Sequence, residues 1–231
     1  MLKEQIVFPL YRMFSDKRIM DLNRKLSSVK IQEYLAVLPS VKGIMACFSR
    51  QDFKEGRCEL EGKQLYMQDY ARQRSAIVYC EAWKEIDKNQ LLAVMTYALT
   101  CGQEPSFSHP SDELYAHMFQ TYSLDFSRKI LEDNLMQIAR QEYGKAEDLH
   151  ILPSFGPGFF GMDFLECEKL ISLLEGAKVG ITTSNGMLHP LKSCVGILIC
   201  IKGNAKIGLE PCQYCSATKD SCEFCTFYGG K

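Results

Sequence analysis

The stretch from Pro153 to Ile201 constrains the fold of this chain more than any other part of its sequence. It opens with a loop rich in glycine and proline, continues as a short amphipathic segment, and ends in two apolar runs. Glycine has no Cβ, so this loop can adopt positive φ angles or approach a ligand closely. We predict a helix after the loop, and then strands at Val179–Thr183 and Ser193–Ile201 joined by Ser184–Ser193.

The rest of the chain mixes helices and strands without a regular alternation. Apolar spacing predicts helices over Asp16–Leu38 and Ser111–Tyr143, and Asp163 is placed to cap a helix that ends near Leu174. Predicted strands are Gly43–Phe48, Ala76–Tyr79, Leu91–Thr100 and Leu149–Leu152, with a hairpin over Arg57–Met67. This order favours an α+β fold over a doubly wound parallel sheet. The helix over Ser111–Tyr143 is interpreted as a wall of the core without functional side chains.

Composition limits the classes of function. The 231 residues are 46% hydrophobic, which suits one domain over residues 1–210 with a tail over 211–231. The 27 Lys and Arg against 28 Asp and Glu include no basic block, so we predict no nucleic-acid partner. The longest apolar run, Val195–Ile201, is too short to cross a bilayer, and the N-terminus lacks the features of a signal peptide. We therefore expect a cytoplasmic protein without a membrane partner.

Four of the 11 cysteines lie in the last twenty residues. Cys212, Cys215, Cys222 and Cys225 form two C-x2-C pairs separated by six residues, an arrangement that can place four thiolates around one ion or cluster. The spacer is shorter than in most zinc ribbons. Zinc, an iron–sulfur cluster and free thiols all remain open at this point. The other seven cysteines lie mostly in apolar runs and are interpreted as small buried hydrophobic residues in a reducing compartment.

The glycine–proline loop and the turn near residue 190 contain the candidate binding residues. Gly156, Pro157 and Gly158 either cradle an anion or cofactor or form only a tight turn. Lys192 either pairs with a carboxylate or phosphate or is a solvated loop residue. His189 is either near a ligand or makes a local hydrogen bond. No catalytic residue is predicted.

Several motifs of this stretch occur in a characteristic order. Pro157-Gly158-Phe159 is followed by the helix, by Lys178–Ser184, by Met187-Leu188-His189-Pro190, and by Lys192-Ser193. In these motifs the chain resembles the activation (reactivation) domain of vitamin B12-dependent methionine synthase, especially its stand-alone bacterial versions. The resemblance covers about residues 20–225 and is strongest over 153–201.

The resemblance implies a curved antiparallel sheet flanked by helices. It also implies binding of S-adenosylmethionine beside a corrinoid, with Gly156, Pro157, Gly158 and Phe159 forming the loop wall. Met187, Pro190 and Lys192 would form the facing wall. In the family, cobalamin belongs to a partner, the corrinoid-binding protein or methyltransferase. One-electron reduction by a donor protein, together with methyl transfer, returns inert cob(II)alamin to methylcobalamin.

Two positions depart from the family pattern. The family places an arginine four residues before the loop glycine to contact the S-adenosylmethionine carboxylate, and this chain has Ser154 there. A neutral hydroxyl cannot replace a charged, bidentate guanidinium. The family tyrosine is Phe159, which keeps the ring but lacks the hydroxyl. The alternative function is therefore a non-catalytic corrinoid-protein binding module or redox adaptor, with a metal or iron–sulfur centre on the cysteine tail.

Overall fold

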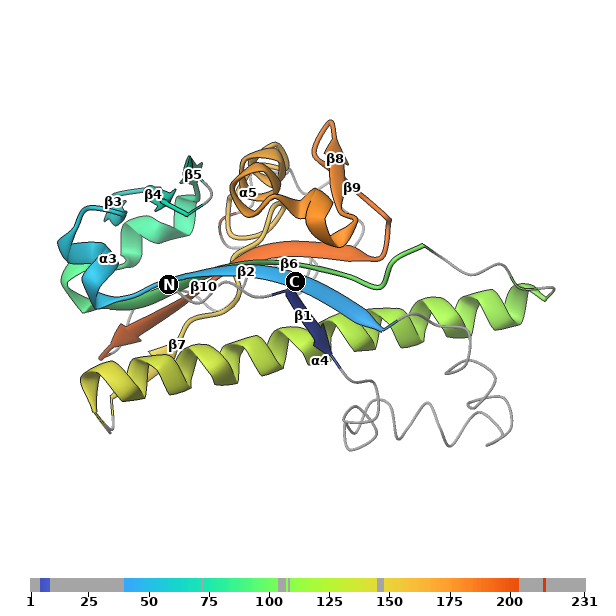
Figure 1. Cartoon of the computed structure of the whole chain (residues 1–231), viewed down its shortest axis with the longest axis horizontal. Coiled ribbons are helices and arrows are strands. Elements are labelled where there is room, and N and C mark those ends of the chain that lie inside the picture. The colour runs from blue at the N-terminus through green and yellow to red at the C-terminus, as the bar shows by residue number, and fades with distance from the viewer. Residues whose placement is uncertain are drawn as a thin grey trace, which may run out of the picture.

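The computed structural model describes residues 5–8, 40–71, 73–103, 107, 109–144, 148–203 and 214. The helix predicted over Asp16–Leu38 lies outside these residues. A five-stranded antiparallel sheet with the order β1-β2-β6-β10-β7 forms the centre of the fold (Figure 1). Its strands are β1 (Gln5–Phe8), β2 (Val41–Phe48), β6 (Leu91–Thr100), β7 (Leu149–Ile151) and β10 (Ser193–Lys202).

Both faces of this sheet are covered, which explains why its strands are apolar at successive positions. In β6, Val94 and Ala98 belong to one hydrophobic cluster, whereas Met95 and Leu99 belong to the other. Side chains alternate between the two faces of a strand, so a strand between two layers needs apolar residues at odd and even positions alike. The strands predicted at Leu91–Thr100 and Ser193–Ile201 are confirmed.

The helix α4 (Pro110–Tyr143) runs across one face of the sheet, and its N-terminal turns extend beyond it (Figure 1). Its buried positions recur every three or four residues and include Leu124, Leu131, Leu135 and Ala139. This spacing places them on one helix face. Gly144, with φ +80°, follows the last helical residue.

The other face carries a second sheet and a short helix (Figure 1). The second sheet contains β3 (Cys58–Glu61), β4 (Gln64–Asp69) and β5 (Arg74–Tyr79), and β3 and β4 form the predicted hairpin. The small helices on this side are α3 (Arg50–Lys54), η2 (Glu81–Glu85) and η3 (Lys88–Gln90). The helix α5 (Glu166–Leu174) contacts β5 and the central sheet. Trp83, Phe155 and Leu170 are fully buried between these layers.

The strand predicted at Val179–Thr183 is largely wrong. Gly176–Val179 forms the 3-10 helix η4, and only Thr182–Ser184 extends as β8. The left-handed conformation of Glu175 and Gly180 at the two ends of η4 turns the chain instead of extending it. β8 then pairs with β9 (Met187–His189), a strand that sequence analysis missed, in a hairpin that projects from the sheet (Figure 1).

The predicted α+β class, with a curved antiparallel sheet flanked by helices, is confirmed. The capping prediction for Asp163 holds only in part, because its carboxylate accepts a hydrogen bond from the Leu165 amide while the helix itself begins at Glu166. Within the described residues, no helix is both long enough and apolar enough to cross a membrane.

Candidate ligand-binding site

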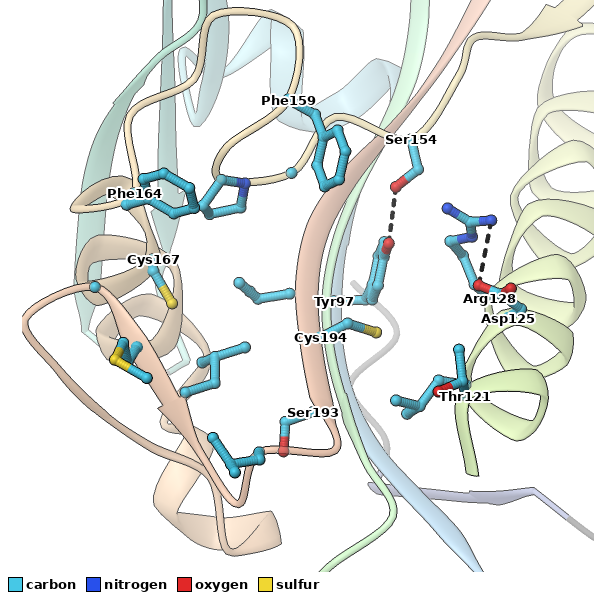
Figure 2. Close-up of a pocket in the computed structure, with 18 residues that line it drawn as sticks. Tyr97, Thr121, Asp125, Arg128, Ser154, Phe159, Phe164, Cys167, Ser193 and Cys194 are labelled. Atoms are coloured by element: carbon cyan, nitrogen blue, oxygen red, sulfur yellow. Dashed lines mark hydrogen bonds and ion pairs between the residues drawn. The ribbon is translucent and has the colours of Figure 1, made fainter. Parts of the chain in front are cut away.

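A pocket of about 550 Å³ lies between α4 and the loop that precedes α5 (Figure 2). The pocket lies beside the part of β10 that is not paired with β7. Within the described chain, β7 pairs with β10 only over Cys200–Lys202, and a single bridge joins Phe155 to Ile197 further along the strand. Beyond that bridge, β10 faces the pocket through Ser193, Cys194 and Val195.

The glycine–proline loop supplies one wall. Gly156, Pro157 and Phe159 line the pocket, whereas Gly158 lies behind them with its φ at +87°. A Cβ on Gly158 would come within 2.7 Å of the Phe164 ring, which also lines the pocket. Glycine is favoured at this position by its conformation, because a positive φ strains residues that carry a Cβ, whereas the exposed Phe164 ring can move aside.

The loop is fixed from behind by the start of η2. The Cys80 thiol and the Ala82 amide both donate to the Phe160 carbonyl, at 3.2 Å each. The Phe160 ring packs edge-on to Phe155, with ring centroids 5.1 Å apart, and lies 6.3 Å from the ring of Tyr214. Tyr214, which stands between Cys212 and Cys215 in the sequence, therefore lies behind the loop.

The β8–β9 hairpin and the turn after it supply the facing wall. Of the residues predicted there, Met187 lines the pocket, whereas Pro190 and Lys192 do not. Pro190 is buried after a cis peptide bond. The Lys192 amine donates to Thr121 Oγ1 at 3.2 Å, and that threonine lines the pocket, so Lys192 lies at its border. His189 is exposed at the end of β9 and does not line the pocket.

Sequence analysis missed the α4 side of the pocket. Thr121, Leu124, Asp125 and Arg128 line it, although no functional side chain was predicted on this helix. The only signal in the sequence is their spacing of three, four and seven residues, which places them on one face. Arg128 is the one Lys or Arg side chain that lines the pocket in the described part of the chain.

Ser154 and Tyr97 form the polar base between these walls. Their hydroxyl oxygens are 2.7 Å apart, a short hydrogen bond that joins the loop to β6 (Figure 2). Burial raises the pKa of the Tyr97 phenol above its ordinary value, and it raises the pKa of the Cys194 thiol to about 12. Both groups are thus neutral near pH 7, and neither is an activated nucleophile.

The predicted metal ligands Cys212, Cys215, Cys222 and Cys225 lie outside the described residues. Among the residues that are described, no group of three or more His, Cys, Asp or Glu side chains is arranged to hold a metal ion. The seven cysteines among the described residues are free thiols; six are buried and Cys194 is half-buried, as expected for small hydrophobic residues.

Comparison with known proteins identifies the fold. No family model and no curated protein matches the sequence. The crystal structure of the MetH reactivation domain bound to AdoHcy matches with a TM-score of 0.63, over 90% of this chain and 81% of that chain. The chain has the fold of the MetH reactivation domain. At 10% sequence identity the likeness establishes the fold alone, and the resemblance to the reactivation domain is confirmed at that level.

Proposed function

We propose that this chain is an accessory protein of a corrinoid-dependent methyltransferase such as methionine synthase, and that its pocket binds S-adenosylmethionine and S-adenosylhomocysteine. One observation carries the proposal. The pocket is walled by the glycine–proline loop in a chain that shares its fold with a reactivation domain crystallised with AdoHcy.

The pocket suits a ligand of this class. Its volume of about 550 Å³ falls within the usual range for small-molecule sites. Phe159 and Phe164 offer aromatic faces to a nucleobase, and Leu188 and Val195 offer apolar contacts to a thioether. Arg128 and Asp125 bring one charge of each sign to the opposite side.

The mouth of the pocket suits a partner that carries a corrinoid. Of the nine large hydrophobic side chains that are exposed in the described residues, four line the pocket and a fifth, Leu165, follows one of them in the chain. These five are Phe159, Phe164, Leu165, Met187 and Leu191, each between 57% and 66% exposed. Exposed apolar residues that cluster in this way are typical of an interaction surface. A partner docked there would exclude water from the pocket.

The part of this chain in the reaction is to bind S-adenosylmethionine and to orient it. S-adenosylmethionine, when bound, supplies the methyl group, and an electron donor protein supplies the electron that converts cob(II)alamin to its nucleophilic state. The loop and the α4 wall would hold the ligand with its sulfur towards the mouth. No catalytic side chain is required of this chain.

Isothermal titration calorimetry with S-adenosylmethionine and S-adenosylhomocysteine tests the ligand. We expect dissociation constants in the micromolar range, and Phe159→Ala should weaken binding about tenfold by removing an aromatic contact. Tyr70→Ala is the matched control, because Tyr70 is 59% exposed and lies outside the pocket. Absence of heat at millimolar ligand would overturn the proposal for the ligand.

In that event the second candidate stands, a corrinoid-protein binding module with a redox centre on the cysteine tail. The contact between Tyr214 and Phe160 favours it, because Tyr214 stands between Cys212 and Cys215 in the sequence and lies close to the loop. Binding to the cobalamin-binding region of methionine synthase tests docking separately from the ligand. Leu191→Asp should abolish docking, while Leu114→Asp, at an equally exposed leucine on α4 outside the pocket, should not.

A further inference from the structure

Part of the hydrogen-bonding capacity of Arg128 is not used by any of the described residues. Arg128 projects from α4 towards the Ser154 and Tyr97 hydroxyls (Figure 2). Its Nε is buried and has no hydrogen-bond partner among the described residues. Its ion pairs are loose, with nitrogen–oxygen distances of 3.7 Å to Asp125 and 3.9 Å to Glu132. Both distances exceed those of a hydrogen bond, so the guanidinium fork can accept a better-placed anion.

The environment of Arg128 strengthens an ion pair between its guanidinium and a bound anion. The side chain of Arg128 is 40% exposed, so its charge stays hydrated at low cost, while the groups beside it are shielded from water. Burial dominates the raised pKa values of Tyr97 and Cys194, and the positive charge of Arg128 opposes the rise in both. The guanidinium is therefore close enough to these buried groups to act on a ligand that contacts them.

The charge pattern selects the kind of ligand. Asp125 also lines the pocket, next to Arg128, so the local charge of the pair is close to zero. A phosphate would be attracted by Arg128 but repelled by Asp125. A zwitterion with its carboxylate and ammonium on the same carbon atom would satisfy both, because the carboxylate meets the guanidinium and the ammonium meets the Asp125 carboxylate.

We infer that Arg128 and Asp125 form a subsite for the α-amino-acid end of the ligand, an inference that rests on the proposed function of the pocket. The cation comes from α4 rather than from the loop, where Ser154 stands instead of arginine. The aromatic residues Phe159 and Phe164, across the pocket, take the nucleoside end. The α4 wall and the aromatic wall thus bind opposite ends of the same ligand.

Calorimetry with two ligands separates this subsite from the rest of the pocket. S-adenosylhomocysteine has the amino-acid end, whereas 5′-methylthioadenosine keeps the nucleoside thioether and lacks that end. We expect wild-type protein to prefer S-adenosylhomocysteine, and Arg128→Met to weaken that ligand about ten- to hundredfold while leaving 5′-methylthioadenosine unchanged. Asp125→Asn should weaken S-adenosylhomocysteine less, about tenfold, because it keeps a hydrogen-bonding oxygen.

Arg140→Met is the matched control, since Arg140 is exposed in the last turn of the same helix and does not line the pocket. Circular dichroism and thermal unfolding establish that each variant is folded, and Arg128→Lys provides a second variant that keeps the charge but loses the fork. If both ligands bind equally, or if Arg128→Met weakens them equally, the subsite is wrong and the proposed function stands. If neither ligand binds wild-type protein, the proposed function fails and the subsite fails with it.

Discussion

Gly196 has no space for a side chain in the middle of β10. A Cβ there would lie 2.8 Å from the Tyr97 hydroxyl and 2.9 Å from the Phe155 carbonyl oxygen. That carbonyl also accepts a hydrogen bond from the Ile197 amide at 2.7 Å, so it cannot move without loosening the loop.

We predict that Gly196→Ala lowers the free energy of unfolding by about 1–3 kcal/mol, the usual cost of overpacking. Urea denaturation measures the change. In a Tyr97→Phe background the same substitution should cost less, because the closest of its three contacts, with the Tyr97 hydroxyl, is gone. Equal stability of Gly196→Ala and wild type would contradict the predicted close packing.

Buried thiols make the protein sensitive to alkali. Burial raises the pKa of the Cys200 thiol from 9.0 to about 11, so the unfolded chain releases this proton before the folded chain does. Between pH 9 and 11 the unfolded state therefore binds fewer protons, and the free energy of unfolding falls as the pH rises. The contribution of the protonated Cys200 thiol to the free energy of unfolding is present in full below pH 9.

We predict that Cys200→Ala removes about 1 kcal/mol of the stability lost between pH 8 and pH 10. Urea unfolding at the two pH values measures the slope. Leu198→Ala, which removes packing from the same strand and no titrating group, should keep the wild-type slope. An unchanged slope in Cys200→Ala would show that the thiol does not titrate as described.

At the scale of single residues, the sequence indicated the loop wall of the pocket better than the α4 wall. Gly156, Pro157 and Phe159 stand in a local motif, so their neighbours in the chain mark them. Arg128 stands in a regular helix, and nothing within a few residues of it differs from an ordinary exposed face. The role that we infer for it depends on β6 and the loop lying beside it, which is a tertiary property.

Among the elements, α4 depends on one row of buried residues. Leu135 is fully buried within the cluster between α4 and the sheet. We predict that Leu135→Ala lowers the free energy of unfolding by about 2–5 kcal/mol, because it removes apolar contacts and leaves a cavity. Gln137→Ala, two residues away on the exposed face, should change it by less than about 0.5 kcal/mol.

Chemical denaturation of both variants measures this difference. Similar small losses in the two would show that the helix is not packed along this row.

The sequence predicted elements well where the signal is local, and poorly where it is not. The runs over Leu91–Thr100 and Ser193–Ile201 are long and apolar, and each proved to be a strand of the central sheet. The run at Val179–Thr183 has similar composition, but Gly180 adopts φ +80° and interrupts it. Strand β9 has only three residues, and its pairing with β8 could not be inferred from so short a segment.

For the whole molecule, the cysteine tail remains a prediction about metal content. We predict one metal site per chain in anaerobically purified protein, abolished in the double variant Cys212→Ser, Cys222→Ser, because four thiolates at this spacing suit zinc or an iron–sulfur cluster. Elemental analysis with an optical spectrum distinguishes the two. Cys200→Ala, at a buried thiol of the central sheet, should retain the metal. Full metal content in the double variant would show that the tail is not the site.

Tyr214 decides where this chain can be shortened. Composition places the end of the main domain at residue 210, but the Tyr214 ring covers Phe160, and its carbonyl oxygen lies 3.0 Å from where a Cβ on Gly161 would stand. A truncated fragment ending at residue 210 would lack Tyr214 and would therefore lose its contact with Phe160 behind the loop. Fragments intended for crystallisation should therefore extend beyond Tyr214 even where the cysteine pairs are to be removed by substitution.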